Sequence, residues 1–244
     1  MSTLNKVIII TGSSRGIGKE VAILLANNGA KVVVNYSNSK VEAENTVNHI
    51  IKNGGTAIAI QADVSDEEQV SKLFDKTIEK FGSVDVLINN AGILISKKLK
   101  DNSQEDFTNL FDINVKGVFN TMQEADSKLS DNGIILNFSS GTTKLMLPTY
   151  AIYSATKAAV EQMTRVFSKE IGRGISVNAI APGPTETELF LNGKTQEQIQ
   201  RLRSMSAFNR LAKPKDIAKV VLFLVSDDSK WISGQIIGAN GALI

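Results

Sequence analysis

Short runs of apolar, mostly β-branched residues recur along the chain, separated by longer segments in which apolar residues return at helical spacing. We expect these runs to be strands, at residues 6–10, 31–35, 57–61, 84–89, 133–138, 175–180 and 234–239. The runs are almost continuously apolar, whereas a strand with one face in water would alternate apolar with polar residues. The pattern therefore predicts an α/β protein with a doubly wound parallel sheet of about seven strands and helices on both faces.

The same pattern indicates how the 244 residues are organised. No internal repeat, low-complexity tract or flexible linker interrupts the alternation, so we expect a single domain over residues 1–244. One segment breaks the alternation, because residues from about 184 to 210 are polar and contain no strand-like run. Long inserts of this kind in compact domains tend to cover binding sites, and we interpret this one as a substrate lid.

Composition and charge remove several classes of function. With 42% hydrophobic and 21% charged residues, the chain can bury a large core. The formal net charge is +2 without a concentrated basic stripe, which disfavours nucleic acid as a partner. There is no cysteine and one histidine, His49, in a helical-looking segment, so we expect no disulfide, no metal site and no Ser-His-Asp triad. Residues 1–10 show no charged segment followed by a long apolar stretch, so we expect a cytoplasmic protein without a membrane partner.

A glycine-rich turn directly follows the first predicted strand. The sequence TGSSRGIG places Gly12, Gly16 and Gly18 between this strand and the next helix. Glycine lets backbone N–H groups approach a pyrophosphate, and the helix N-terminus adds partial positive charge. An ordinary βα turn also accepts glycines, but the position after the first strand of an α/β chain favours a dinucleotide site and a Rossmann-type sheet.

Further motifs follow in order along the chain. NNAG occupies residues 89–92, and Asn114 lies in FDINVKGVF. Ser140 precedes Tyr153 by thirteen residues, and Tyr153 precedes Lys157 by four. Together with the TGxxxGxG spacing of the glycine turn, this ordered set resembles the short-chain dehydrogenase/reductase family over essentially the whole chain. The resemblance implies a nicotinamide-dependent oxidoreductase that interconverts a carbonyl and an alcohol.

The resemblance also implies which residues bind the cofactor. They come from the glycine turn, the end of the second strand, the DV pair after the third strand, NNAG, the tyrosine-lysine helix and the PGPTET loop: Gly12, Ser14, Arg15, Gly16, Ile17, Gly18, Tyr36, Ser37, Asp63, Val64, Asn90, Ala91, Gly92, Tyr153, Lys157, Pro182, Gly183, Thr185 and Thr187. Considered without the family, Asp63 can instead cap the helix that follows it. NNAG can likewise be an ordinary Asn-Gly turn, which is compatible with supporting a cofactor.

Two tyrosines and two serines compete for the catalytic positions. On one helix, Tyr153 and Lys157 are i and i+4 and share a face. Tyr150 lies seven residues before Lys157 on roughly the same face, so periodicity alone leaves it open. Ser139 and Ser140 leave a strand end where successive side chains point to opposite faces, so only one should reach the site. The family spacing selects Tyr153 and Ser140.

Catalytic roles are also implied by the resemblance. Tyr153 gives a proton to the carbonyl oxygen as the hydride arrives, while Lys157 lowers the tyrosine pKa and holds the ribose. Ser140 polarises the carbonyl, and Asn114 supports a water-linked proton relay. Ionising a phenol of pKa about 10 at neutral pH costs about 4 kcal/mol. A cation about 4 Å away, at an effective dielectric of about 20, contributes a similar amount, which explains why a lysine is wanted there.

The end of the second strand bears on the choice of cofactor. Family members that prefer NAD carry an acid there for the ribose 2′-OH, whereas Asn35, Tyr36 and Ser37 offer no carboxylate to repel a 2′-phosphate. Arg15, inside the glycine turn, can pair with that phosphate, although an exposed arginine there also suits a merely solvated loop. We expect NADP(H) to be favoured over NAD(H).

The substrate is less sharply defined than the reaction. The chain resembles 3-oxoacyl-[acyl-carrier-protein] reductases first, and NADPH-dependent aldehyde and ketone reductases close behind. We therefore expect a small-molecule carbonyl or an acyl thioester as the substrate. A non-catalytic NADP-binding sensor is the alternative from another class, and the intact catalytic set disfavours it.

Charge near the fifth strand bears on protein partners. Residues 124–133 carry three acids against one lysine, so we expect an acidic acyl carrier protein to confer little advantage over a small substrate. Another basic surface open to such a partner consists of Arg173, Arg201, Arg203 and Arg210. The resemblance also implies a homotetramer, in which apolar residues of two long helical segments, about 104–130 and 152–172, can meet instead of facing the sheet.

Overall fold

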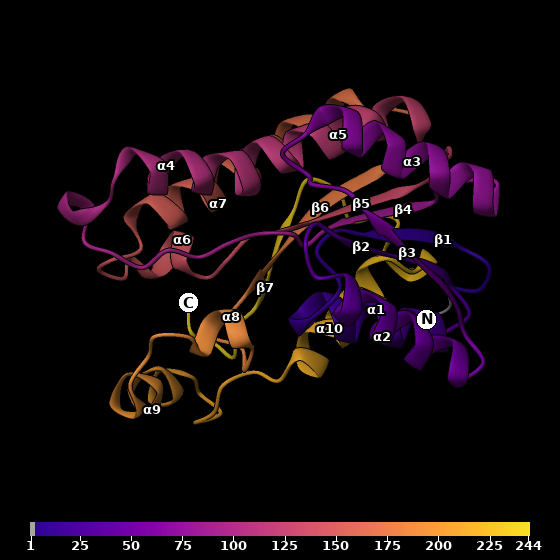
Figure 1. Cartoon of the computed structure of the whole chain (residues 1–244). Helices are drawn as coiled ribbons and strands as arrows, with labels where there is room; N and C mark the ends of the chain where they lie inside the picture. The colour runs from indigo at the N-terminus through magenta and orange to yellow at the C-terminus, as the bar shows by residue number, and fades with distance from the viewer. Residues whose placement is uncertain (1–2) are drawn as a thin grey trace.

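The computed structural model describes residues 3–244, which form a seven-stranded parallel sheet flanked by helices (Figure 1). The strands are β1 (Val7–Ile10), β2 (Lys31–Tyr36), β3 (Thr56–Gln61), β4 (Val86–Asn89), β5 (Ile134–Phe138), β6 (Ser176–Pro182) and β7 (Ile236–Ala239). They lie in the order β3-β2-β1-β4-β5-β6-β7, and every adjacent pair is parallel. The Rossmann-type doubly wound fold predicted from the apolar runs is confirmed.

Helices cover both faces of the sheet (Figure 1). One face carries α1 (Gly16–Asn27), α2 (Lys40–Lys52) and α10 (Pro214–Leu224). The other face carries α3 (Glu67–Phe81), α5 (Gly117–Lys128) and α7 (Ala151–Glu170). The remaining helices are α4 (Gln104–Phe111), α6 (Thr142–Leu145), α8 (Glu188–Leu191) and α9 (Gln196–Met205), with single 3₁₀ turns at Leu99–Asp101 and Asp227–Ser229.

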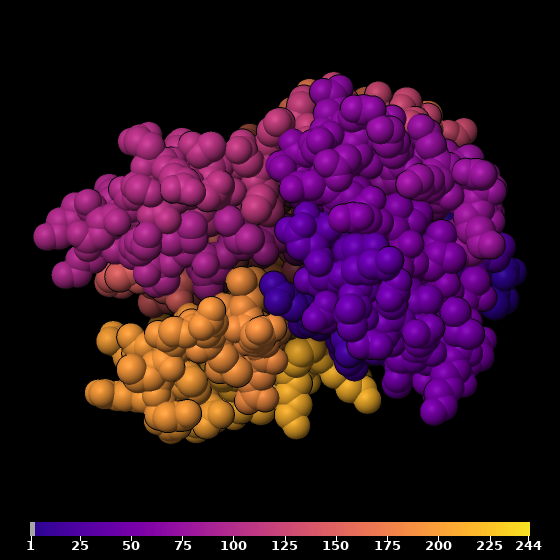
Figure 2. Space-filling view, viewed as in Figure 1, coloured from indigo at the N-terminus to yellow at the C-terminus, as the bar shows by residue number. Residues whose placement is uncertain are grey.

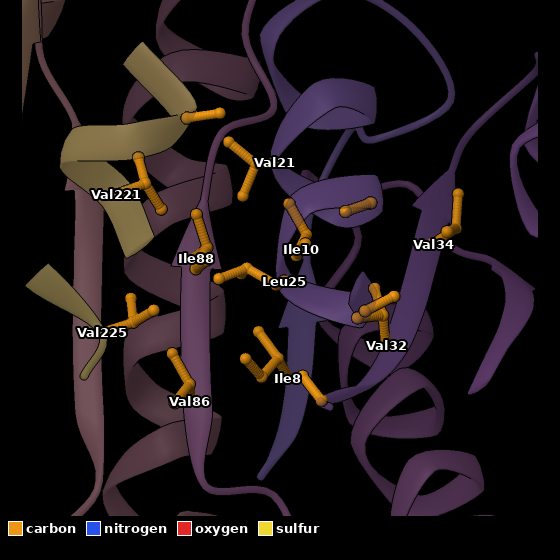
Figure 3. Packing of buried hydrophobic residues seen from close by; sticks show 14 of the residues in the cluster. Ile8, Ile10, Val21, Leu25, Val32, Val34, Val86, Ile88, Val221 and Val225 are labelled. Atoms are coloured by element: carbon orange, nitrogen blue, oxygen red, sulfur yellow. The ribbon is translucent and has the colours of Figure 1, made fainter. Parts of the chain in front are cut away.

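Side-chain alternation along each strand explains why the apolar runs are continuous. Ile8 and Ile10 pack in the core cluster that includes α1 and α10, whereas Ile9 between them packs in the cluster on the α3, α5 and α7 side. Figure 3 shows part of the first cluster, with Val21 of α1 and Val221 of α10 lying against the sheet. Because both faces of the sheet are buried, neither set of alternating positions requires polar side chains.

The secondary structure departs from the sequence prediction in residues 104–130 and is more detailed than predicted in residues 184–210. The helix expected over about 104–130 is interrupted by a π-helical turn at Asp112–Lys116, which separates α4 from α5. Residues 184–210, which the sequence predicts to be a substrate lid and which we call the lid segment, contain α8 and α9. Their first backbone N–H groups are capped by Thr187 and Thr195, whose side chains accept hydrogen bonds three residues on. These caps explain how a polar segment becomes helical.

The strand order places a cleft at the carboxyl ends of the strands. From β1 the chain builds outward through β2 and β3, then returns to add β4 on the other side of β1, so connections diverge between these two strands. A cleft of about 470 Å³ lies there, and side chains of α8 and α9 form part of its wall. Figure 2 shows the lid segment as an orange lobe beside the indigo N-terminal part of the chain. Within residues 3–244, no helix combines the length and apolar character needed to cross a membrane.

Candidate active site

The cleft gathers nearly all of the site residues predicted from the sequence. Among the predicted cofactor-binding and catalytic residues, only Gly18 and Asn114 do not line it. The lining also includes residues that sequence analysis did not assign to the site: Asn35, Ile93, Leu94, Leu145, Leu147, Leu189, Phe190 and Leu202. Across the described residues 3–244, no three His, Asp or Glu side chains gather in a way that would hold a metal ion.

The glycine turn is pressed against the segment that follows β4. A Cβ atom on Gly12, whose φ is +60°, would lie 2.8 Å from Ala91 Cα, and a Cβ on Gly18 would lie 2.5 Å from Asn90 Nδ2. Asn90 Nδ2 donates to the carbonyls of Thr11 (2.9 Å) and Gly12 (3.0 Å). Both close approaches require the absence of a side chain. The cradle therefore fits a dinucleotide, whose diphosphate needs close access to backbone N–H groups.

Asn35 supports the glycine turn from the end of β2. Its Oδ1 accepts a hydrogen bond from the Gly12 N–H (3.1 Å), and its Nδ2 donates to the Ala62 carbonyl (3.0 Å) just beyond β3. The side chain is buried, so it ties the turn to the β2–β3 edge. In the sequence, Asn35 was notable only for its lack of a carboxylate. The signal of its second role is its position as a lone polar residue in an apolar run.

Asp63 shapes the turn that precedes α3. Its carboxylate accepts hydrogen bonds from the backbone N–H (2.9 Å) and the hydroxyl (2.7 Å) of Ser65. The residue that caps α3 is Asp66, whose side chain accepts from the Gln69 N–H. The alternative in which Asp63 itself caps this helix is therefore wrong. Asp63 lines the cleft, where it stays a predicted cofactor-binding residue.

Asn114 lies behind the cleft in the π-helical turn. The buried side chain accepts from the Ile93 N–H (2.8 Å) and donates to the Ile93 carbonyl (3.0 Å) and to Thr156 Oγ1 (3.2 Å). These bonds join the segment after β4 to α7. Because both amide protons are used within the protein, a water in the predicted relay can meet only the remaining lone pair of Oδ1 or the backbone.

Tyr153 and Lys157 lie one turn apart on α7, but the Lys157 ammonium group binds the Phe138 carbonyl and not the Tyr153 hydroxyl. Its Nζ donates to the Phe138 carbonyl (2.8 Å) and lies 5.9 Å from the centre of the Tyr153 ring. Burial raises the pKa of Tyr153 to about 12, although a hydrogen bond with Ser140 lowers it. Burial lowers the pKa of Lys157 to about 8. Desolvation of the phenol therefore outweighs the hydrogen bond with Ser140. The lowering of the Tyr153 pKa by Lys157 stays a prediction.

The two serines at the end of β5 have different partners. Ser139 Oγ donates to the buried Glu161 carboxylate (2.7 Å), whereas Ser140 Oγ accepts from the N–H (3.3 Å) and the hydroxyl (3.1 Å) of Thr142. Ser140 also lies close enough to Tyr153 to lower the pKa of its phenol. This arrangement favours Ser140 for contact with a substrate. The rings of Tyr150 and Tyr153 meet edge to face with centroids 6.2 Å apart, and both line the cleft. Tyr150 therefore forms the wall beside the predicted acid.

Arg15 extends from the glycine turn to the lid. Its guanidinium lies 3.4 Å from the Glu188 carboxylate of α8, and both side chains are largely exposed. The backbone comes close at the same place, because a Cβ on Gly16 would lie 3.7 Å from Thr187 Cγ2. An exposed pair of this kind contributes only about 0–1 kcal/mol. Arg15 is therefore free to exchange its partner for a phosphate.

Known proteins resemble this chain over almost its whole length. Residues 12–242 match the family described as enoyl-(acyl carrier protein) reductase. The versicolorin reductase stcU of Emericella nidulans is 42% identical over 249 residues, which cover 97% of this chain and 94% of that protein. The NADPH-dependent aldehyde reductase 2, chloroplastic, of Arabidopsis thaliana is 40% identical over 255 residues, covering 98% of this chain and 94% of that protein.

A solved structure shares both the fold and much of the sequence. The short-chain dehydrogenase from Burkholderia cenocepacia J2315 in complex with NADP has a TM-score of 0.94 and 33% identity, covering 100% of this chain and 99% of that one. The sheet and its cleft thus define a nicotinamide-dependent oxidoreductase. The chain belongs to the short-chain dehydrogenase/reductase family, which confirms the resemblance drawn from its motifs.

Proposed function

We propose that this chain is an NADPH-dependent reductase of small free aldehydes or ketones. The observation that carries the proposal is one cleft in which Ser140, Tyr153 and Lys157 share a lining with the glycine turn. Support for NADP(H) comes from the acid-free end of β2 and from Arg15, which lines the same cleft. Further support comes from one relative named as NADPH-dependent and another solved in complex with NADP.

The residues of the cleft handle the proton while the cofactor supplies the hydride. Tyr153 donates its phenolic proton to the carbonyl oxygen, and the Ser140 hydroxyl donates a second hydrogen bond to that oxygen. Lys157 Nζ lies 5.9 Å from the centre of the Tyr153 ring, and its positive charge stabilises the resulting tyrosinate. A separation of about 6 Å at an effective dielectric of about 20 corresponds to about 3 kcal/mol, which opposes the cost of burying the phenolate. In the direction of alcohol oxidation, the tyrosinate is the base.

The cleft lining outside the cofactor segments is mostly apolar. Its apolar and aromatic members include Ile93, Leu94, Leu145, Leu147, Tyr150, Leu189, Phe190 and Leu202, beside the polar residues Ser139, Ser140, Thr142 and Glu188. Burial against such a surface favours an apolar carbonyl compound at about 25 cal/mol per Å². Arg15 and Lys157 are the basic residues among those lining the cleft, and both are assigned to the cofactor. An anionic substrate would therefore lack a charged partner.

Surface charge disfavours a carrier-protein substrate. Carboxylates pair with three of the four arginines that sequence analysis considered for docking: Arg173 with Asp131 (3.4 Å), Arg203 with Glu186 (3.8 Å) and Arg210 with Asp216 (2.6 Å). Arg173 also precedes β6, so within one subunit it lies at the amino edge of the sheet, opposite the cleft. An acidic partner would need uncompensated positive charge beside the entrance.

The proposal is tested by following NADPH oxidation against aldehydes, ketones and acetoacetyl groups on either carrier protein or a short soluble thiol. We expect turnover of free carbonyls and little advantage for the carrier-bound group. A carrier preference above about tenfold, or about 1.4 kcal/mol, that is lost at higher salt would contradict the assignment to free carbonyls. NADPH binding without oxidation by any carbonyl would contradict the reductase assignment itself.

We also propose that the chain is one domain whose residues 184–210 act as the lid, and that it assembles as a homotetramer. Side chains of α8 and α9 line the cleft, which supports the lid. Phe107, Phe119 and Val166 are exposed on α4, α5 and α7, where a partner subunit can cover them. Light scattering at micromolar concentration should give the tetramer mass, and a 26.3 kDa species alone would exclude assembly.

A further inference from the structure

Three successive turns of α7 hold the strand end that carries Ser140. Tyr153, Lys157 and Glu161 are i, i+4 and i+8 on this helix, so they share one face. Tyr153 lies beside Ser140 in the cleft, and Lys157 donates to the Phe138 carbonyl that ends β5. Glu161 accepts a hydrogen bond from Ser139 (2.7 Å), the residue between Phe138 and Ser140 in the chain. Tyr153 and Lys157 belong to the proposed chemistry, whereas Glu161 does not contact the reacting groups.

Glu161 is a buried carboxylate whose two oxygens have separate partners. The residue is 6% exposed. Its Oε1 accepts from Ser139 Oγ (2.7 Å) and Thr143 Oγ1 (2.9 Å), and its Oε2 accepts from Arg165 (3.3 Å). A carboxylate is strongly disfavoured in the interior unless it is paired and hydrogen-bonded. Its donors therefore keep the charge in place, and the charge in turn fixes Ser139 and Thr143 relative to α7.

Ser139 and Thr143 lie on either side of Ser140 in the chain. Thr143 Oγ1 also lies 3.1 Å from the Ser140 carbonyl, so its single proton is shared between that carbonyl and Glu161. The backbone on both sides of Ser140 is thus anchored to one carboxylate oxygen. We propose that Glu161 is a positioning residue for carbonyl reduction, which holds the Ser140 hydroxyl toward Tyr153 by anchoring Ser139 and Thr143. The inference rests on the proposed function, because Ser140 must act on the substrate carbonyl.

A positioning role and a purely structural role have different kinetic consequences. A structural tie affects the stability of the fold and leaves the turnover of folded molecules unchanged. A positioning residue affects kcat, because a misplacement of about 1 Å at the reacting groups can cost about a hundredfold in rate. Glu161 and Thr143 are not among the residues that line the cleft, so the affinity for NADPH should not depend on the anchor.

Two substitutions separate the roles of the carboxylate oxygens. For Glu161→Ala, we expect kcat per NADPH-binding site to fall by at least about tenfold, while the Kd for NADPH stays within about twofold. Glu161→Gln keeps an oxygen acceptor for Ser139 and Thr143, so it should restore kcat to within about threefold of the unmodified enzyme. Kd is measured by NADPH fluorescence, and thermal unfolding is recorded for each variant.

Arg165→Gln is the matched control, because it removes the cation at Oε2 and leaves the anchor at Oε1; kcat should not change. Thr143→Val removes one donor with little change of shape, so it keeps the proposal testable if Glu161→Ala fails to fold. An unchanged kcat in both Thr143→Val and Glu161→Ala overturns the proposal. A loss in Glu161→Gln and Arg165→Gln as large as in Glu161→Ala also overturns it. An unmodified enzyme that reduces no carbonyl refutes the proposed function first.

Discussion

The two sides of the cleft are built differently. On the cofactor side, buried contacts fix the glycine turn: Asn35 and Asn90 bond its backbone, and neighbouring atoms leave no room for a Cβ at Gly12 or Gly18. On the lid side, α8 and α9 are short helices with many exposed side chains. One exposed ion pair, from Arg15 to α8, joins the glycine turn to the lid.

This difference shows where each kind of specificity is encoded. On the cofactor side, the proposed dinucleotide site is formed by the shape of the backbone, and a Cβ added at Gly12 or Gly18 would clash with it. The lid presents Leu189, Leu191 and Met205 partly exposed on short helices, so their replacement disturbs little else. Segments with few buried contacts also open most easily. Substrate preference is therefore free to change while cofactor binding stays constant.

The largest expected effect comes from replacing Tyr153, the proposed proton donor to the substrate carbonyl. Tyr153→Phe should lower kcat for carbonyl reduction by about 10²–10⁴-fold, because it deletes the proton donor and keeps the ring. The Kd for NADPH should be retained, which fluorescence titration checks. Tyr150→Phe is the control and should keep most of the activity. The reverse pattern would transfer the catalytic role to Tyr150.

A second test concerns the unfavourable burial of the Lys157 ammonium group on the cofactor side of the cleft. The pKa of Lys157 is about 8 in the fold against an ordinary 10.5. Below pH 8 the folded protein bears the full penalty of a buried charge, and this penalty is relieved as pH rises from 8 to 10.5. Lys157→Met should therefore raise the free energy of unfolding at pH 7 by at most about 3 kcal/mol while abolishing reduction.

This gain is measured by chemical denaturation at several pH values without added cofactor. The gain should shrink as pH rises from 8. It should vanish above about pH 10.5, where Lys157 is deprotonated in both the folded and the unfolded protein. A gain that is independent of pH would show that shape, not charge, limits stability at this position.

Glycines on the two sides allow a direct comparison. Gly18→Ala places a Cβ 2.5 Å from Asn90 Nδ2 and 2.9 Å from a backbone oxygen, so we expect a loss of about 1–3 kcal/mol in stability and weaker NADPH binding. Gly193→Ala, between α8 and α9, has φ +73° and no atom within 4 Å. It should cost about 1–2 kcal/mol for the backbone alone and leave NADPH affinity unchanged. Equal effects on NADPH affinity would refute the contrast.

The smallest expected effect is on the choice of cofactor. Tyr36 packs in the core, so Ser37→Asp, at the half-buried residue that follows β2, tests the acid-free end of this strand more cleanly. It should shift the ratio of kcat/KM for NADPH over NADH by about tenfold toward NADH, or about 1.4 kcal/mol. Ser127→Asp, on the exposed side of α5, controls for the added charge. Equal efficiency with both cofactors in the unmodified enzyme would remove the basis of this prediction.

What the sequence could predict was local, and what it missed depends on contacts between distant segments. The glycine turn follows directly from residue type and position, and the helical spacing places Tyr153 beside Lys157. By contrast, the anchoring of Ser139 by Glu161 joins residues 22 apart, and no spacing rule signals it. The rise of the Tyr153 pKa through burial was likewise not foreseen from the sequence. Pairwise charge can be read from spacing, whereas desolvation requires the packed structure.

The packing of α1 against α10 also determines when the molecule can finish folding. Ile8 and Leu25 are buried in the same cluster as Val221 and Val225, although the second pair is made near the end of synthesis (Figure 3). At roughly 5–20 residues per second, a ribosome needs roughly 10–40 s to pass from α1 to α10. During that interval α1 and α2 are the helices that can cover this face of the sheet. The share of the cluster that α10 contributes is therefore the last to be buried.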